Sequence, residues 1–323
     1  MWLARTRGHR DALASVLRLV RFVNSWSVAF LRLSTCALIV SHLACAGEAA
    51  LPERDASQFP SDASLEAFPV EVVDDSGVRH RFQAPPTRIV SLVPSATQTL
   101  LALGVGGRLV GRTDFDQLSE LAALPSVGGG LQPNLEVLVS LEPDFVVRFE
   151  GESDRATANR LTDLGIPNFA IRPDGIDDVL SSIERLGLIT DQRVAADALL
   201  AEIRGDLADV AARVEGRPRR SVVYLMGGEP PWVAGPGTYI DELVVSGGAV
   251  NVFDDLEGLY GPISLEELIT REVDLVLVSE EGGSPDLIDV EHASIPSWVE
   301  VPGPGLGEAA KLIARLIHPE AFP

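Results

Sequence analysis

The chain has 323 residues, of which 46% are hydrophobic, which is enough to bury one large core or two medium ones. Its formal net charge is −21, and residues 47–323 alone hold 20 basic against 46 acidic side chains. So acidic a surface repels nucleic acid and anionic lipid, so neither is expected as a partner.

Residues 1–46 have the pattern of a secretory signal peptide. Six arginines precede the apolar run "CALIVSHLACA" (36–46), which is short and ends in small residues. Two processing routes are open: cleavage after Ala46, or lipidation of Cys45, because "HLAC" (42–45) resembles a lipobox. We therefore expect export, either to the periplasm or to the outer side of a membrane, with contact to the membrane only through such an anchor.

The exported part begins with a polar, proline-containing stretch, residues 47–68, which is predicted to be a flexible tether. It contains no pair of cysteines, since Cys36 and Cys45 are the only two in the chain, so its stability has to come from packing.

An N-terminal α/β lobe is predicted over residues 69–176. Two β-rich runs around "DDSG" (74–77) indicate a hairpin. After it, apolar strand-like runs alternate with amphipathic helices, which is typical of a parallel sheet covered by helices. The predicted strands are 88–95, 108–113, 144–149 and 167–171, and the predicted helices are 96–104, 133–143 and 155–166.

A connecting helical region follows at 177–217, where strand signals are absent. Apolar residues recur there at helical spacing, namely Leu199, Ile203, Leu207, Val210 and Val214. This stripe predicts one long helix over 191–214 that ends before Pro218.

The strand and helix alternation then restarts in a C-terminal α/β lobe, residues 218–323. Strands are predicted at 221–228 and 274–280, and helices at 239–248, 264–273 and 307–319. Ser264 and Glu267 have the spacing of a capping box. The fold class is thus α/β: two lobes with mainly parallel sheets, joined by one long rigid helix.

The two lobes contain a short sequence repeat. "NLEVLVSLEPDFVV" (134–147) and "SLEELITREVDLVL" (264–277) agree at six positions when offset by 130 residues, and both have glutamate in third place, at Glu136 and Glu266. A first-turn glutamate favours the helix dipole by about 0.3–1 kcal/mol, which could explain each one separately. Capping does not require the same position in both lobes, however, whereas a two-fold receptor would.

Motifs for catalysis are missing from the sequence. It has no phosphate-binding P-loop and no nucleophile elbow. The five histidines are scattered without metal-ligand spacing, so no catalytic residue and no metal ligand is predicted. The glycines at 128–130 and 227–228 follow strands, where ligands meet parallel sheets, although simple turns would explain them equally well. Six aromatic or basic residues at predicted strand ends are candidates for contacting a ligand: Phe115, Arg148, Phe149, Trp232, Tyr239 and Tyr260.

Four ordered motifs give the chain a family resemblance. The motifs are "RIVSLVPSATQTLLALGVGGRLVG", "LPSVGGGLQPNLEVLVSLEPDFVV", "AGPGTYIDELVVSGGAVNVF" and "PISLEELITREVDLVLVS". Together they resemble the periplasmic substrate-binding proteins of ABC importers for cobalamin, haem and iron–siderophores. The resemblance covers Val70 to Pro319. It implies the class III binding-protein fold, also called the helical-backbone metal-receptor fold, with cargo between two lobes.

The resemblance also implies roles for residues. Glu136 and Glu266 match the family's permease-docking glutamates. The cargo would be bound by Ser95, Phe115, Gly129, Arg148, Phe149, Trp232, Tyr239 and Tyr260, and Gly129 stands where some cobalamin binders have tryptophan. We expect a monomer that is not an enzyme, has no intrinsic cofactor and delivers a corrinoid to an importer.

Other readings remain open. Arg112, Arg148 and Arg172 would suit an anionic iron–siderophore, and haem would need a tyrosine or histidine ligand. A different class would be an enzyme or metal chelatase on the same frame, or a sensor without transport. The segment 298–306 is shorter than is usual in the family, which predicts a second lobe without its last edge strand.

Overall fold

The structure is a computed structural model that describes residues 68–280 and 290–323. These belong to Ser61–Pro323, one of two compact units in the chain. The predicted signal peptide, the lipidation site Cys45 and all but the last residue of the predicted tether lie outside the described residues.

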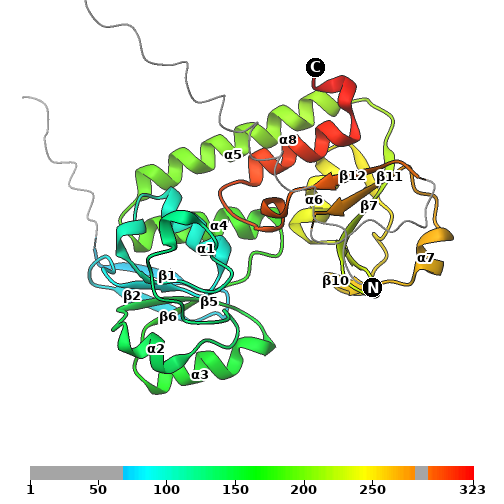
Figure 1. Cartoon of the computed structure of the whole chain (residues 1–323). Coiled ribbons are helices and arrows are strands. Elements are labelled where there is room, and N and C mark those ends of the chain that lie inside the picture. Colours follow the sequence, from blue (N-terminus) through cyan, green and yellow to red (C-terminus); the bar gives the residue numbers. More distant parts are fainter. Residues whose placement is uncertain (1–67, 281–289) are drawn as a thin grey trace, which may run out of the picture. The chain divides into compact units, whose positions relative to one another are not determined.

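The N-terminal half is built on a parallel four-stranded sheet, as the alternating pattern predicts (Figure 1). Its strands are mostly apolar on both faces because helices cover both sides. In spatial order they are β4 (Leu109–Gly111), β3 (Ile89–Ser91), β5 (Phe145–Phe149) and β6 (Asn168–Ile171). The helices between them are α1 (Pro94–Ala102), α2 (Leu135–Ser140) and α3 (Arg155–Asp163).

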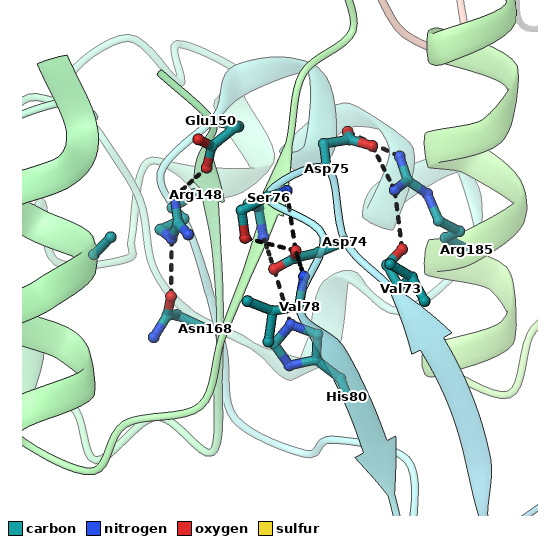
Figure 2. Close-up of polar contacts among 12 residues, drawn as sticks. Val73, Asp74, Asp75, Ser76, Val78, His80, Arg148, Glu150, Asn168 and Arg185 are labelled. Carbon is teal, nitrogen blue, oxygen red and sulfur yellow. Dashed lines mark hydrogen bonds and ion pairs between the residues drawn. The ribbon is translucent and has the colours of Figure 1, made fainter. Parts of the chain in front are cut away.

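The predicted hairpin at the start forms a separate two-stranded sheet, β1 (Val70–Val73) and β2 (Arg79–Phe82). Asp74 organises its turn, as Figure 2 shows. One carboxylate oxygen accepts bonds from the Ser76 amide (3.0 Å) and hydroxyl (2.7 Å) and from the Val78 amide (2.9 Å). The other contacts His80 Nε2 (2.8 Å) and accepts from the Ala170 amide (3.2 Å). The last bond joins the hairpin to β6.

A second aspartate ties the hairpin to the helical region. The Asp75 carboxylate receives two bonds from the Arg185 guanidinium, at 2.7 and 2.9 Å (Figure 2). Arg185 belongs to α4 (Ile176–Ile189), the first of two connecting helices. The hairpin is therefore fixed to the sheet edge by the buried Asp74 and to α4 by the more exposed Asp75.

The connecting region contains the predicted long helix, α5 (Arg193–Val214), directly after α4. The residues of the predicted stripe lie on its inward side: Ile203, Val210 and Val214 are buried, and Leu199 and Leu207 pack against the core. In Figure 1, α5 (green) lies beside α8 (Leu306–Ile317, red).

The C-terminal half has a mixed sheet. β7 (Arg220–Gly227) is parallel with β11 (Leu275–Ser279), and β11 is parallel with the edge strand β12 (His292–Ile295). Antiparallel β8 (Trp232–Ala234) and β10 (Tyr260–Pro262) extend the sheet, and β9 (Ala249–Asn251) pairs with the start of β7. The helices are α6 (Tyr239–Ser246), α7 (Leu265–Ile269) and α8.

Local details differ from the sequence prediction in this half. Helix α7 ends at Ile269, four residues earlier than predicted. The Ser264 hydroxyl accepts the Glu267 amide as a capping box requires, but the Glu267 carboxylate pairs with Arg271 (3.2 Å). Within the described residues 290–323, β12 leads to α8 with no further strand between them, as the short 298–306 segment predicts.

Candidate functional site

Phe115 stands on a rigid turn after β4. The Asp116 carboxylate accepts bonds from the Thr113 amide (2.8 Å) and hydroxyl (2.7 Å), and both residues are buried. The Phe115 amide donates to the Thr113 hydroxyl oxygen at 3.2 Å. The Phe115 side chain nevertheless remains 66% exposed. A large aromatic group is thus held out to solvent on a fixed backbone, which reduces the entropy cost of contacting a ligand.

The glycines at 128–130 lie beside this turn, since the Asp114 amide donates to the Gly128 carbonyl at 3.0 Å. Gly128 has φ +82°, a conformation that favours glycine. A Cβ on Gly130 would stand 2.2 Å from the Leu92 carbonyl oxygen, so no larger residue fits without a backbone shift. A Cβ on Gly129, in contrast, would meet open space. The tight turn therefore leaves room at Gly129.

Arg148 is engaged inside the N-terminal half. Its side chain is 8% exposed and donates to Asn168 (2.8 Å), Glu150 (3.1 Å) and Asp154 (2.9 Å), the first two of which Figure 2 shows. Asp154 is fully buried, and burial raises the pKa of its carboxyl to about 6 although the Arg148 charge opposes this. The Nη1 of Arg148 is therefore committed to carboxylates of its own lobe, and its Nε to Asn168.

The other two candidate arginines are also partly committed. Arg172 forms an ion pair with Asp174. Arg112 donates to the Thr113 carbonyl (2.9 Å), and its buried Nε has no partner within the described residues. No cluster of three unpaired guanidinium groups is present among these three residues, although an anionic chelate would favour one.

All three tyrosines of the chain gather in the C-terminal half around Glu300. Tyr224 donates to the Glu300 carboxylate (3.3 Å), and Tyr239 donates to the Val299 carbonyl (3.4 Å). Burial, reinforced by the Glu300 charge, raises the pKa of Tyr224 and Tyr239 far above the usual range, and Tyr260 shifts in the same direction. The three phenols are therefore neutral at pH 7 in the cargo-free protein.

Both tryptophans of the described part are exposed, Trp232 to 45% and Trp298 to 41%. Trp232 begins β8, and Trp298 belongs to the short 3₁₀ turn Ser297–Glu300 that follows β12. Trp298 is absent from the sequence prediction, although a tryptophan directly after a strand and a proline could have indicated it. Tyr224 and Glu300 were missed as well, because a central strand and a short turn show no periodic signal for a site.

Direct contacts connect the two halves close to these residues. The Tyr239 amide donates to the Asp174 carbonyl (2.6 Å), and the Glu242 carboxylate accepts the Ile176 amide (2.7 Å) at the start of α4. A Cβ on Gly303 would lie 3.3 Å from the Ser95 carbonyl oxygen. Ser95 and Tyr239 are therefore buried at the junction, whereas Phe115 and Trp232 are exposed, and Phe149, Tyr260 and Gly129 are half-buried.

Glu136 and Glu266 occupy matching places on α2 and α7. Asn134 and Ser264 cap the two helices through their side-chain oxygens, and each helix buries one leucine, Leu138 or Leu268. Both glutamates are exposed. Neither carboxylate has an ion pair or hydrogen bond within the described residues, so both can bind an external cation.

Two features are absent from the part of the chain that the structure describes, a metal cluster and a membrane-spanning helix. In residues 68–280 and 290–323, no group of three or more histidine, cysteine or acidic side chains could hold a metal ion. None of the helices in these residues has the length and hydrophobicity of a membrane span.

Comparison with known proteins identifies the family. The family model for periplasmic binding proteins matches residues 89–293. A cobalamin-binding protein of Halobacterium salinarum is 32% identical over 276 residues, covering 82% of this chain and 72% of that protein. An uncharacterized ABC transporter substrate-binding lipoprotein of Bacillus subtilis is 26% identical over 288 residues, covering 83% and 91%.

A solved structure confirms the fold. The periplasmic vitamin B12-binding protein BtuF of Vibrio cholerae superimposes with a TM-score of 0.66 at 20% identity, covering 74% of this chain and 99% of that one. These likenesses decide between the classes left open by the sequence, in favour of a binding protein without intrinsic cofactor. The chain belongs to the periplasmic binding protein family, whose members bind small-molecule cargo outside the cytoplasm for a permease and its ATPase and are not enzymes.

Proposed function

We propose that this protein binds a corrinoid between its two lobes and delivers it to the permease of an ABC importer. The observation that carries the proposal is the set of exposed aromatic side chains, Phe115 in one half and Trp232 and Trp298 in the other. A corrinoid presents a wide, flat macrocycle, and aromatic side chains offer a large apolar contact to such a surface at low entropy cost. The name of the Halobacterium relative supports the same cargo.

The same residues give less support to the two other cargo classes, iron–siderophores and haem. An iron–siderophore would favour unpaired arginines, but Arg148 and Arg172 are already paired with carboxylates. Haem would favour a tyrosine or histidine ligand, but Tyr224 and Tyr239 are buried and already donate to Glu300 and to the Val299 carbonyl. These two cargo classes serve as the comparison in the test.

The test is a calorimetric titration of residues 47–323 with cobalamin, cobinamide, a ferric hydroxamate and haem. We expect heat with the corrinoids, and Phe115→Ala or Trp232→Ala should each weaken the affinity about tenfold, or about 1.4 kcal/mol. Val194→Ala, an exposed aliphatic residue on α5, is the matched control. Heat with haem or the hydroxamate alone would overturn the corrinoid assignment.

We further propose that Glu136 and Glu266 dock the loaded protein onto cationic side chains of the permease. Both carboxylates are exposed and lack partners within the described residues. Glu136→Lys with Glu266→Lys should abolish uptake and leave cargo affinity within about 0.5 kcal/mol, as for surface changes away from a site. Glu184→Lys with Glu202→Lys changes the net charge equally on α4 and α5 and should leave uptake intact. Uptake that survives the first pair would refute docking.

Anchoring by Cys45 is our proposal for how the protein is retained, and the lipoprotein name of the Bacillus relative supports it. Labelling cells with an alkyne fatty acid should mark the wild type and Cys36→Ser but not Cys45→Ser. An unlabelled wild type that starts at Gly47 would favour simple cleavage after Ala46, and a labelled Cys45→Ser protein would place the lipid on another residue. We expect the released protein to be a monomer, which light scattering would measure.

A further inference from the structure

We propose that each docking glutamate has an aliphatic partner, Val139 beside Glu136 and Ile269 beside Glu266, and that each pair forms one composite contact for the permease. This inference rests on the docking role proposed above and adds the apolar half of the interface. Hereafter these pairs are called the α2 patch and the α7 patch, after the helices labelled in Figure 1.

The geometry of the two patches is the same. In each helix the glutamate is the second residue and the aliphatic side chain the fifth, so the two lie one turn apart on the same face. Val139 is 42% exposed and Ile269 is 62% exposed. The residue just before each of them, Leu138 or Leu268, is buried and holds the opposite face on the core.

The ends of the two helices also match. The Ser140 hydroxyl donates to the Val137 carbonyl (2.7 Å), and the Thr270 hydroxyl donates to the Glu267 carbonyl (2.8 Å). Each hydroxyl satisfies a carbonyl of the last turn directly after the aliphatic residue. The position of the aliphatic side chain relative to the glutamate is therefore fixed in the same way in both lobes.

A single exposed aliphatic residue is common on soluble proteins and needs no explanation. Here the exposed aliphatic residue recurs at the same position of a repeat in which some other surface positions differ. For example, the residue of the first lobe that corresponds to Glu267 is Val137. The Glu267 carboxylate, moreover, is paired with Arg271. Exposure and aliphatic character are kept at the position that faces the same way as the free glutamate.

The partner that fits both patches has a cation next to an apolar recess, and carries this combination twice. The outer face of a permease made of two related halves offers such a repeated surface. Charge complementarity with the acidic chain would steer the encounter, while apolar burial would slow dissociation.

The experiment measures binding to nanodiscs that hold the permease–ATPase complex through which the wild type supports uptake. Val139→Ser with Ile269→Ser should raise Kd about tenfold, or about 1.4 kcal/mol, through faster dissociation, and equally at low and high salt. Glu136→Gln with Glu266→Gln should instead slow association, and this effect should shrink with salt. Val139→Ile with Ile269→Val keeps the apolar character and should bind like the wild type.

The controls separate the two proposals. Val194→Ser with Val250→Ser removes two exposed valines from α5 and β9 and should leave Kd within twofold. If the serine variants of the patches bind within twofold of the wild type while the glutamine variants bind weakly, the apolar half is refuted and docking stands. If the glutamine variants also bind like the wild type, docking itself fails. If Val194→Ser with Val250→Ser raises Kd as much as the serine variants of the patches do, a specific apolar contact is refuted.

Discussion

Replacing Asp74 with asparagine should destabilise the protein by about 3 kcal/mol at neutral pH. The Asp74 carboxylate is almost fully buried, and it accepts hydrogen bonds from the Val78 amide in its own turn and from the Ala170 amide of β6. An amide can keep one oxygen toward Ser76 and Val78, but its NH₂ group then faces the Ala170 amide and His80. Two hydrogen bonds to a charged acceptor, each contributing about 1.5–3 kcal/mol, are weakened or lost.

The pH dependence follows from the same contacts. Burial alone would raise the pKa of Asp74, but the bonds from His80, Ser76, Val78 and Ala170 outweigh it and hold that pKa well below its ordinary value. A carboxyl with a depressed folded pKa stabilises the protein above its unfolded pKa, which is about 3.9 for aspartate. This stabilisation is lost as the pH falls toward the folded pKa. The deficit of the variant is therefore full at pH 5–7 and shrinks below pH 4.

The assay is urea unfolding followed by circular dichroism at pH 7 and pH 3, with thermal melts at pH 7. For a chain of this size, 3 kcal/mol corresponds to a fall in melting temperature of roughly 6–12 °C. Asp197→Asn, an exposed aspartate on α5, is the control and should change stability by less than about 0.5 kcal/mol. A deficit below about 1 kcal/mol for Asp74→Asn, or an equal deficit at both pH values, would refute the reasoning.

Three further outcomes are expected. Arg148→Ala should lower the free energy of unfolding by about 3–5 kcal/mol, because it leaves Asp154 buried without its cation. The cargo affinity measured by calorimetry should stay within threefold. A large loss of affinity in a still folded protein would assign Arg148 to the site instead. Glu242→Ala removes the acceptor of the Ile176 amide at the start of α4 and should lower stability by about 1 kcal/mol in urea titrations, with no change if solvent caps the helix equally well. Gly129→Trp should fold normally, since a Cβ there meets open space, and should tighten corrinoid binding several-fold; weaker binding would show that this space is needed for the cargo.

Much of the fold could be predicted because its signals are local. Ser264 is predicted from the sequence to cap a helix, and it does cap α7. The turn at residues 74–77 and the fully buried strand β3 were equally evident, since turn residues and burial on both faces are visible in the local sequence. The repeat likewise placed Glu136 and Glu266 on matching helices.

The short strands of the second sheet could not be predicted. β8, β9 and β10 have three residues each and contain or adjoin glycine or proline, so they carry no periodic pattern. They are strands only because β7 supplies unpaired backbone groups on which β8 and β9 complete their hydrogen bonds, with β10 added on β8.

By itself, the sequence determined the α/β class, the long connecting helix and the identity of the aromatic, basic and acidic candidates, because these depend on residue type and spacing. The tertiary structure alone decided how accessible each candidate is. It buries Arg148 against Asp154 and Tyr239 against the backbone of Val299, and it leaves Phe115, Trp232 and Trp298 exposed. Burial depends on contacts between segments far apart in the chain, such as Tyr224 with Glu300, and no local pattern encodes such a contact.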